Sequence, residues 1–247
     1  MRFALFRRGA SEPAHLEVSH DGHVFRVGVR RRANARRMTL RVSNATGEVA
    51  LTVPERTDLD AARRFARAHA GWIAARLARI PPRVAFEADA EIPLRGVPRR
   101  IVHRPELQAS VEAVTDPDGQ ALIAVSVEPA RLARAVRTFL AREARRDLAH
   151  CVGRHTAALG LAPRPIAVRD TRSRWGSCSS HGSLSFSWRL ILAPPFVLDY
   201  LAAHEVAHLR ELNHSQRFWR IVQGLCPRTD EAERWLKRHG ADLHRYG

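Results

Sequence analysis

The feature that most constrains the fold of this chain is an unbroken helical pattern from about residue 129 to 159. Pro129 suits the first position of a helix, and Gly160 suits the position just after its last turn. Apolar residues between them recur at helical spacing: Leu132, Val136, Phe139, Leu140, Leu148, Cys151, Val152, His155 and Leu159. A long helix with one apolar stripe must be covered by other elements, so the pattern predicts a packed domain in the C-terminal half.

Strand-like segments lie on both sides of this helix. Before it, the sequence predicts strands at 24–29, 38–42 and 49–53, a helix at 57–80 beginning at Thr57, and short strands within 84–127. After it, the sequence predicts strands at 166–169, 172–178 and 184–191, a helix from Pro194-Pro195, and helices at 215–225 and 230–239. The fold class is therefore α+β. We predict a boundary near residue 128, between a β-rich N-terminal region (1–128) and a C-terminal domain (129–247), and no internal repeat is visible.

Composition narrows the class of protein. Hydrophobic residues make up 45% of the 247 and charged residues 27%, which favours a globular chain over a disordered one. No apolar run approaches the roughly 20 residues of a membrane span, and the first ten residues do not form a secretory signal. The three cysteines include no C-x-x-C pair, which is typical of reduced thiols. We therefore expect a cytoplasmic protein that does not enter a membrane.

The charge is strongly positive, at +16, and the basic residues are 40 arginines and one lysine. Seven arginines and no acidic residue lie between His23 and Arg41: Arg26, Arg30, Arg31, Arg32, Arg36, Arg37 and Arg41. Guanidinium groups bind phosphate in a forked geometry, so this cluster is either a site for a triphosphate or nucleic-acid backbone or simply a solvated hairpin surface. Charge alone does not establish a nucleic-acid partner.

A short motif carries the chemistry. Residues 204–208 read H-E-V-A-H on a predicted helix, a pattern expected about 0.04 times by chance at this composition. His204 and His208 are four residues apart and therefore share one helical face, so both rings can reach one metal ion. Glu205, beside the first histidine, can then remove a proton from water that zinc has made more acidic.

A catalytic zinc ion needs a third protein ligand. His214 is our first choice, because Asn213 tolerates the left-handed turn that would bring the chain back after the helix. Glu211 is on the same helical stripe but nearly a turn beyond the metal. Glu231 and Glu233, on a later predicted helix, are the remaining alternatives.

Several segments together resemble the YgjP-like metallopeptidase family, which is related to the SprT-like zinc proteases. The resemblance is carried by residues 174–179 (RWGSCS), 184–190 (LSFSWRL), 198–200 (LDY) leading into the histidine motif, 213–215 (NHS) and Phe218-Trp219. It is dense over 172–219, whereas in the N-terminal half only the arginine-rich hairpin and Trp72-Ile73 are similar to the family.

The resemblance implies a zincin-like catalytic domain, in which a mixed sheet packs on the motif helix and the long helix. It implies one zinc ion held by His204, His208 and His214, with Glu205 as general base. It also implies that the strand containing Trp175, Gly176 and Ser177 borders the cleft, where an edge strand can pair with an extended peptide.

Other residues are candidates for substrate binding. Arg172, Arg174 and Arg189 flank the predicted cleft strands and can bind phosphate or a developing oxyanion, although outward-facing strand positions are an equally simple interpretation. Tyr200 lies one turn before His204 and can either stabilise a tetrahedral intermediate or pack in the core with its hydroxyl bonded to a neighbour. Asp199 is a candidate for orienting a ligand histidine.

Three functions remain open from the sequence. The first is a zinc metallopeptidase that acts on peptides. The second is a metal-dependent nucleoside triphosphate pyrophosphohydrolase acting on UTP, an activity described for some YgjP-like proteins. The third is a DNA-associated SprT-like protease, which the +16 charge favours. The sequence does not indicate an oligomeric state.

Overall fold

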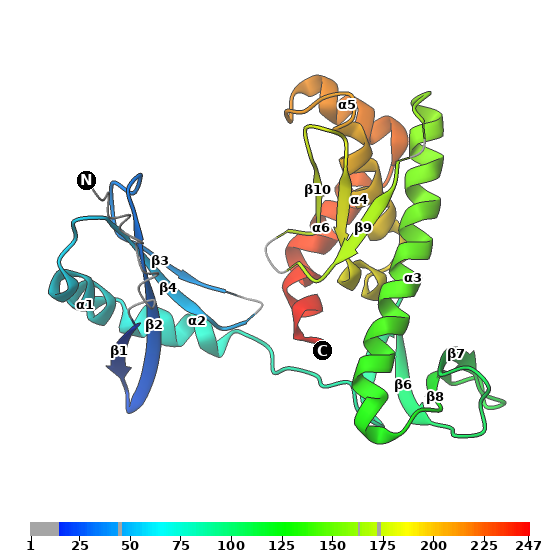
Figure 1. Cartoon of the computed structure of the whole chain (residues 1–247), viewed down its shortest axis with the longest axis horizontal. Helices are drawn as coiled ribbons and strands as arrows, with labels where there is room; N and C mark the ends of the chain where they lie inside the picture. Colours follow the sequence, from blue (N-terminus) through cyan, green and yellow to red (C-terminus); the bar gives the residue numbers. More distant parts are fainter. Residues whose placement is uncertain (1–14, 44–45, 163, 172–173) are drawn as a thin grey trace, which may run out of the picture. The chain divides into compact units, whose positions relative to one another are not determined.

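The computed structural model describes residues 15–43, 46–162, 164–171 and 174–247. The chain divides into two compact units, Met1–Pro81 (unit 1) and Pro82–Gly247 (unit 2), which are coloured blue to cyan and green to red in Figure 1. Each unit has its own cluster of buried apolar residues. Among the described residues, no helix is both long enough and apolar enough to cross a membrane.

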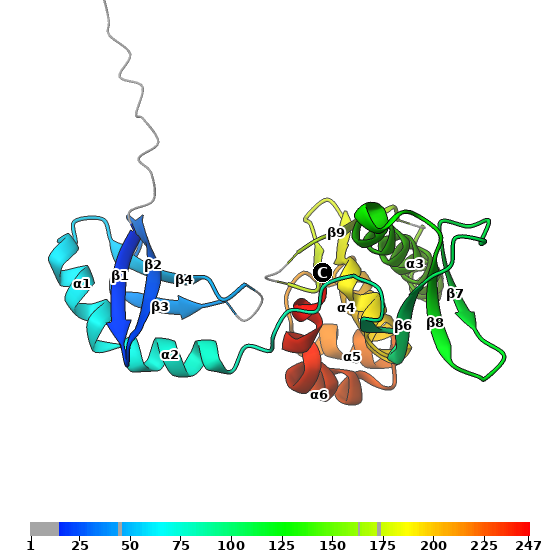
Figure 2. The same ribbon diagram turned by 90° about the horizontal axis from the view of Figure 1, so that it is seen from below.

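Unit 1 contains four strands and two helices. In chain order they are β1 His15–His20, β2 His23–Arg32, β3 Thr39–Val42, β4 Val49–Pro54, α1 Leu59–Ala68 and α2 Ala70–Ala78. The sheet order is β1-β2-β4-β3, with β2 and β4 parallel and the outer pairs antiparallel. Alternate residues such as Val27, Leu51 and Val53 are fully buried, and α1 and α2 contact the strands on that face (Figure 2).

The helix predicted at 57–80 is two helices in the structure. His69 departs from helical geometry (φ −107°), and its Nδ1 lies 2.8 Å from the carbonyl oxygen of Phe65. The first helix is capped by Asp58, whose carboxylate accepts a hydrogen bond from the Ala61 amide, and not by Thr57. The apolar periodicity continues across the break, so periodicity alone did not reveal it.

Unit 2 combines a second four-stranded sheet with a helix-rich part. Its strands are β5 Glu91–Leu94, β6 Val97–His103, β7 Val111–Thr115, β8 Ala121–Val125, β9 Ile166–Arg169, β10 Gly176–Cys178 and β11 Leu184–Ser187. Its helices are α3 Pro129–Ala158, η1 Trp188–Leu192, α4 Pro195–Ala207, α5 Gln216–Leu225, α6 Thr229–His239 and η2 Gly240–Arg245, where η marks a 3₁₀ helix. The α+β class is confirmed.

The predicted boundary near residue 128 does not match this division. The four-stranded sheet, of order β5-β6-β8-β7, packs on α3 and shares one core with the C-terminal helices. Ile101 and Ile123 of this sheet belong to the same buried cluster as Leu140 of α3 and Leu201 of α4. The strand-to-helix change of pattern at 128 is therefore a junction within unit 2, and the units meet in sequence at Pro81-Pro82.

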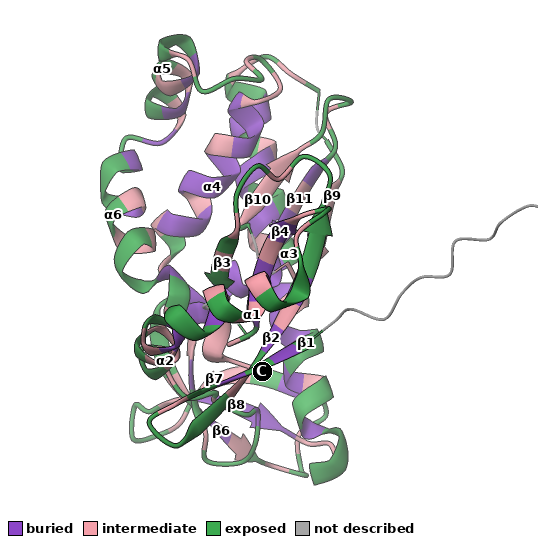
Figure 3. Cartoon of the chain, turned by 90° about the vertical axis from the view of Figure 1, so that its left-hand side faces the viewer, coloured by how far each residue is buried: buried purple, intermediate pink, exposed green. Residues whose placement is uncertain are grey.

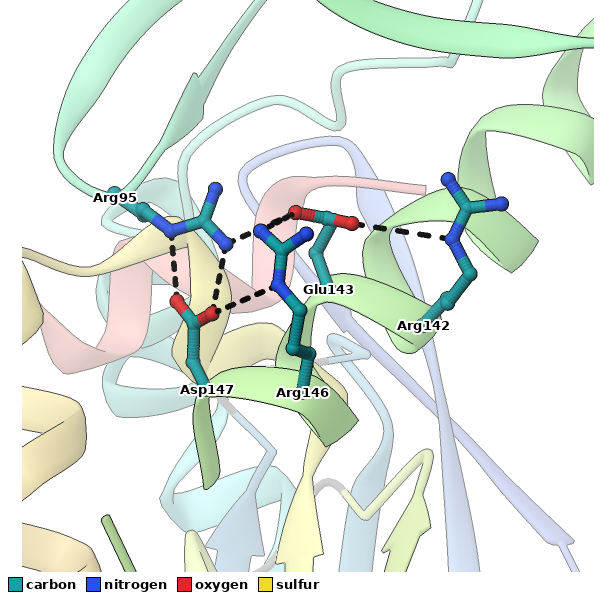
Figure 4. Close-up of polar contacts among 5 residues, drawn as sticks. All are labelled: Arg95, Arg142, Glu143, Arg146 and Asp147. Carbon is teal, nitrogen blue, oxygen red and sulfur yellow. Dashed lines mark hydrogen bonds and ion pairs between the residues drawn. The ribbon is translucent and has the colours of Figure 1, made fainter. Parts of the chain in front are cut away.

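A partly buried ion network attaches the β5–β6 hairpin to α3 (Figure 4). The guanidinium of Arg95 donates to both oxygens of Asp147 at 2.7 and 2.8 Å and to Glu143 at 2.9 Å. Arg146 also donates to Glu143, at 2.6 Å. These bonds raise the pKa of Arg95, with the hydrogen bond to Asp147 as the largest contribution, so the hairpin is tied to the helix by fixed charges.

The second sheet of unit 2 has the order β10-β11-β9. The strand predicted at 184–191 ends at Ser187, whose hydroxyl caps the 3₁₀ turn η1. Only residues 176–178 of the strand predicted at 172–178 are in β10, which forms an outer strand of the sheet beside α4. Arg172, a candidate substrate residue, lies outside the described residues.

The two four-stranded sheets share one topology, although the sequence shows no repeat. Each sheet consists of two antiparallel hairpins, β1–β2 and β3–β4 in unit 1 and β5–β6 and β7–β8 in unit 2. The two hairpins are joined by a parallel pair, which is β2 with β4 in unit 1 and β6 with β8 in unit 2. Val27 pairs with Val49 and thereby occupies the position that Ile101, paired with Ile123, has in unit 2. Only the apolar character of these positions is kept, which explains why the repeat is not visible in the residues.

Candidate active site

The centre of the site is the helix α4. Pro194 and Pro195 begin it, and its residues are apolar nearly all round, which is typical of a buried helix. Figure 3 shows α4 mostly in the colour of buried residues. The rings of His204, on its last turn, and His208, at its C-terminal cap, are 5.2 Å apart between centroids. The predicted common face of these two histidines is therefore present.

His214 joins them from the loop after α4. Its Nε2 lies 3.2 Å from Nε2 of His204, and one nitrogen from each of the three rings lies within 4.8 Å of the others. Asn213 does not adopt the left-handed backbone expected for it. Its side-chain oxygen accepts a hydrogen bond from the Ser215 amide, and Ser215 caps α5. The loop is therefore turned by side-chain bonds to its backbone and by the start of the next helix.

Hydrogen bonds orient the rings of the motif. Nδ1 of His208 lies 3.0 Å from the carbonyl oxygen of Glu211. A carbonyl only accepts, so this nitrogen carries the proton and Nε2 keeps its lone pair for the shared space. Glu211 thus acts through its backbone and not through its carboxylate.

Tyr200 lies behind His204 and is 4% exposed. Its hydroxyl donates to Oε1 of Glu233 at 3.0 Å and lies 3.4 Å from Nδ1 of His204. Burial and the charge of Glu233 raise the pKa of Tyr200, which keeps the hydroxyl protonated as a donor. Of the two roles predicted for Tyr200, its burial and its bonded hydroxyl match packing in the core and not contact with a substrate. The tyrosine also connects Glu233 to His204.

Aromatic rings close the other sides of the cluster. The buried ring of Phe218 is 4.6–4.9 Å from the rings of His204, His208 and His214, and Trp219 lies 5.9 and 6.0 Å from the rings of His204 and His214. Burial, and then the two neighbouring histidines, lower the pKa of His204 to about 4. The ring is therefore neutral at physiological pH, which is the state that can donate a lone pair to a metal.

Glu205 is 5% exposed and points toward β10. A methyl group at Gly176 would lie 2.5 Å from Oε1 of Glu205, so the carboxyl group packs directly against the glycine backbone. Burial raises the pKa of Glu205 to about 7, and the positive charge of Arg174 opposes this shift. A carboxyl group with this pKa can both accept and release a proton near neutral pH.

The candidate substrate residues are arranged around this glycine. Arg174 is exposed and close enough to act on Glu205 through its charge. Trp175 stacks on His244 at 4.7 Å between ring centroids. Gly176 and Ser177 are half-buried on the outer strand β10. These residues therefore share one short segment beside α4.

Two further candidates are placed elsewhere. Arg189 is 1% exposed, forms an ion pair with Asp170 and lies over the ring of Trp188 at 4.4 Å, so it stabilises the core and is not available to a substrate. Asp199 binds His155 of α3 at 2.8 Å and not a histidine of the motif. Asp199 and Arg189 each pair with a charged or polar side chain from a distant segment. Spacing along the chain did not indicate these pairs.

One feature of the site was not anticipated from the sequence. Gly176 was expected only to border a cleft, whereas it provides the space that Glu205 occupies. The connection of Glu233 to Tyr200 had a partial signal, because Tyr200 is one helical turn before His204. Glu231, the other acidic alternative, pairs with Arg228 instead.

Comparison with known proteins gives a family. The family model described as "YgjP-like, metallopeptidase domain" matches residues 36–239. No curated protein matches. One solved structure that is similar, titled as the crystal structure of the metallopeptidase zymogen of Pyrococcus abyssi abylysin, is 22% identical, covers 37% of this chain and 93% of its own, and superposes with a TM-score of 0.34.

Proposed function

Because this chain belongs to the YgjP-like metallopeptidase family, we propose that it is a zinc-dependent peptidase with a zincin-like site in unit 2. His204, His208 and His214 would hold one zinc ion, and Glu205 would be the general base. The observation that carries the proposal is the convergence of three imidazole nitrogens within 4.8 Å beside a buried carboxyl group.

The donor set fits zinc. Two nitrogens on one tetrahedral zinc ion lie about 3.3 Å apart when each bond is about 2.05 Å. The Nε2 atoms of His204 and His214 are 3.2 Å apart. Neutral imidazole is a preferred zinc ligand, and three protein ligands leave the fourth position open, as in catalytic sites.

When bound, zinc would supply a Lewis acid that polarises the scissile carbonyl and makes water more acidic. Glu205 would accept the proton of the attacking water on a carboxylate oxygen and pass it to the leaving amine nitrogen. Gly176 leaves the carboxyl group room beside β10. Tyr200 and the Glu211 carbonyl would keep the two helix rings in orientation.

The outer strand β10 is suited to hold an extended peptide. Among the strands of the described residues it pairs with β11 alone, and it lies next to α4. Main-chain hydrogen bonds along such an edge would position a peptide without reading its sequence. Arg174, at the start of this strand, would face the developing oxyanion or a substrate carboxylate.

The test compares Glu205→Gln with wild type in zinc content and in cleavage of a mixed peptide library. We expect Glu205→Gln to keep one zinc per chain and to lose at least about 10³-fold in cleavage rate, because only the base is removed. Glu211→Gln is the matched control, since its contact with His208 is through the backbone and should be unaffected. Equal cleavage by wild type and Glu205→Gln would contradict the proposed base.

The same preparation tests the nucleotide alternative with UTP. Hydrolysis of UTP without peptide cleavage would replace the peptidase proposal. It has less support from the candidate phosphate ligands within unit 2. Arg189, the candidate phosphate ligand nearest in sequence to the motif, is already bound to Asp170.

A further inference from the structure

Several arginines of unit 1 lie on one face of its sheet. Residues in a strand alternate between the two faces, and Val27 and Val29 of β2 face the core. The alternate positions Arg26, Arg30 and Arg32 therefore lie on the opposite face, where all three are exposed.

The strand register places a fourth arginine on this face and gives it a floor of small residues. Arg41 of β3 pairs with Ala50 of β4, and Ala50 pairs with Gly28 of β2. In the next row, Thr39 pairs with Thr52 and Thr52 with Arg30. Neighbouring strands are about 4.8 Å apart, so Arg41 and Arg30 lie on the two sides of a floor about 10 Å wide. We call this surface the arginine face.

Carboxylates neutralise only part of this charge. Residues 15–81 contain thirteen arginines and six acidic residues. Arg30 binds Glu48 at 2.7 Å. Among the described side chains of the unit, no ion pair is formed by Arg32, Arg37 or Arg41. These guanidinium groups are therefore open to an external anion.

An aromatic groove lies at the edge strand β3, between this strand and the helices that pack on the other face of the sheet, and it shares Thr39 with the arginine face. It has a volume of about 300 Å³ and is lined by Arg37, Met38, Thr39, Leu40, Phe65, His69 and Trp72. Phe65 and His69 are stacked at 4.3 Å between ring centroids, and Trp72 is 47% exposed. An indole with half its surface in water offers a ring face to a ligand, since most tryptophans are largely buried.

We propose that unit 1 binds single-stranded nucleic acid, with bases stacked on the groove aromatics and phosphates held by the arginine face. Stacking platforms beside a basic track are what sequence-tolerant binding of single strands requires. An acidic peptide would use the arginines but would have no need of exposed rings. A duplex has its bases already stacked and would use the arginines alone. This function is additional to the proposed peptidase and does not depend on it.

The second sheet allows a row-by-row comparison with the arginine face. The row equivalent to Arg41, Ala50 and Gly28 is Glu112, Ala124 and Val102. It carries an acid in place of an arginine and a valine in place of a glycine, and Ala124 is 0% exposed. Arg26 and Arg30 have arginine counterparts 74 residues later, at Arg100 and Arg104. The charge at Arg41 and the glycine in the floor are therefore what distinguish this row of unit 1 from its counterpart in unit 2.

The test is fluorescence anisotropy of the full chain with labelled 20-mers of dT, of U and a 20-base-pair duplex, over 50–200 mM salt. We expect both single strands to bind more tightly than the duplex, and the dT and U arms to show whether DNA or RNA is preferred. Trp72→Ala should weaken single-strand binding about tenfold, and Trp72→Phe should restore most of it, because stacking needs a ring.

Charge variants test the second half of the proposal. Arg32→Ser with Arg41→Ser should reduce the slope of log affinity against log salt by about 1.4, at about 0.7 for each phosphate contact. Arg64→Ser with Arg67→Ser removes the same charge from the exposed side of α1 and should leave the slope almost unchanged. Leu59→Ala, at another exposed apolar position, is the control for Trp72→Ala.

Circular dichroism of each variant establishes that the fold is intact before affinities are compared. The proposal is overturned if single strands and duplex bind equally, or if the control pairs lose as much affinity as the test variants. It is also overturned if no binding occurs at 50 mM salt, where the electrostatic contribution is largest.

Discussion

The two four-stranded sheets of this protein share their topology but differ in what they support. Val27 corresponds to Ile101 and Leu51 to Val125, a spacing of 74 residues in both cases. The first hairpin turns at Asp21-Gly22 in unit 1 and at Arg95-Gly96 in unit 2, with positive φ at all four residues. Such turns twist in the same sense as the strands, which explains why both copies use them.

The difference begins at that turn. Asp21 is exposed, and its one ion pair among the described side chains is with His20, at 3.4 Å. Arg95 instead reaches α3 and binds Asp147 and Glu143. One sheet therefore presents its hairpin to solvent, and the other fastens it to the helix that supports the candidate active site.

The helices that follow the sheets extend this contrast. Unit 1 has two short helices broken at His69, which leave the aromatic groove beside β3. Unit 2 has one helix of 30 residues that contacts α4 and carries its sheet into the same core as the histidine motif. If the proposed binding is correct, one scaffold would provide a binding surface in unit 1, where two short helices cover one face, and a structural base in unit 2, where a long helix covers it.

The largest effect is expected from removing a core side chain in each sheet. Leu51 and Ile101 are both 0% exposed, and each replacement by alanine should lower the free energy of unfolding by about 2–5 kcal/mol. Because the cores are separate, hydrogen exchange measured by mass spectrometry should accelerate in unit 1 only for Leu51→Ala and in unit 2, including α4, for Ile101→Ala. Accelerated exchange in both units for either variant would show that the two units do not unfold independently.

The second effect concerns the two hairpin turns. Arg95→Ala should lower the free energy of unfolding of unit 2 by about 2–3 kcal/mol, because Asp147 and the buried Glu143 lose a shared partner. Arg95→Lys keeps the charge but not the forked geometry and should fall in between. Asp21→Ala, with a similar backbone, should cost about 1 kcal/mol or less in urea unfolding. Equal losses of unfolding free energy for Arg95→Ala and Asp21→Ala would contradict the difference inferred between the two hairpin turns.

What the sequence could predict depended on whether a signal was local. The bounds of α3 were predicted within a residue, because Pro129 and Gly160 mark its ends by backbone chemistry. The common location of the three histidines was predicted from spacing on a helix and a short loop. Their role as ligands stays a prediction.

Contacts between distant segments were not predictable in the same way. The bond between Tyr200 and Glu233 joins residues 33 apart, and the place of Glu205 depends on a glycine of another element. The boundary near 128 did not match because a change of secondary structure was read as a change of unit. The shared core of β8 and α3 forms only after folding, so no local pattern contains it.

Acid sensitivity gives a third, smaller distinction between the units. Burial tends to raise the pKa of Asp199, but the hydrogen bond and charge of His155 and the charge of Arg154 outweigh it, so this pKa is lowered. A lowered pKa in the folded state contributes stability that is complete above the unfolded value of about 3.9 and is lost as pH falls through the folded value. Asp199→Asn should therefore lower the free energy of unfolding by about 1–2 kcal/mol at pH 7.

Urea unfolding of unit 2 from pH 7 to pH 2.5 measures this distinction. The difference between Asp199→Asn and wild type should stay constant above about pH 5 and shrink below about pH 4. Asp60→Asn, which removes an exposed pair with Arg63 in unit 1, should change little at any pH. A difference for Asp199→Asn that persists undiminished at pH 2.5 would mean that packing and not charge is responsible.

The smallest effect tests whether the second turns are also equivalent. Gly47 and Gly119 follow β3 and β7, with φ of 70° and 79°. A methyl group at Gly119 would meet nothing within 4 Å, and one at Gly47 would make ordinary contact with Leu77 at 3.6 Å. Space is therefore available at both, and the cost of alanine is the left-handed backbone alone, about 1 kcal/mol in each unit. Gly153, in the regular helix α3, is equally open, so Gly153→Ala should instead stabilise unit 2 by about 0.5–1 kcal/mol. A lower melting temperature for the two turn variants and a higher one for Gly153→Ala would show that backbone conformation, and not crowding, decides the effect.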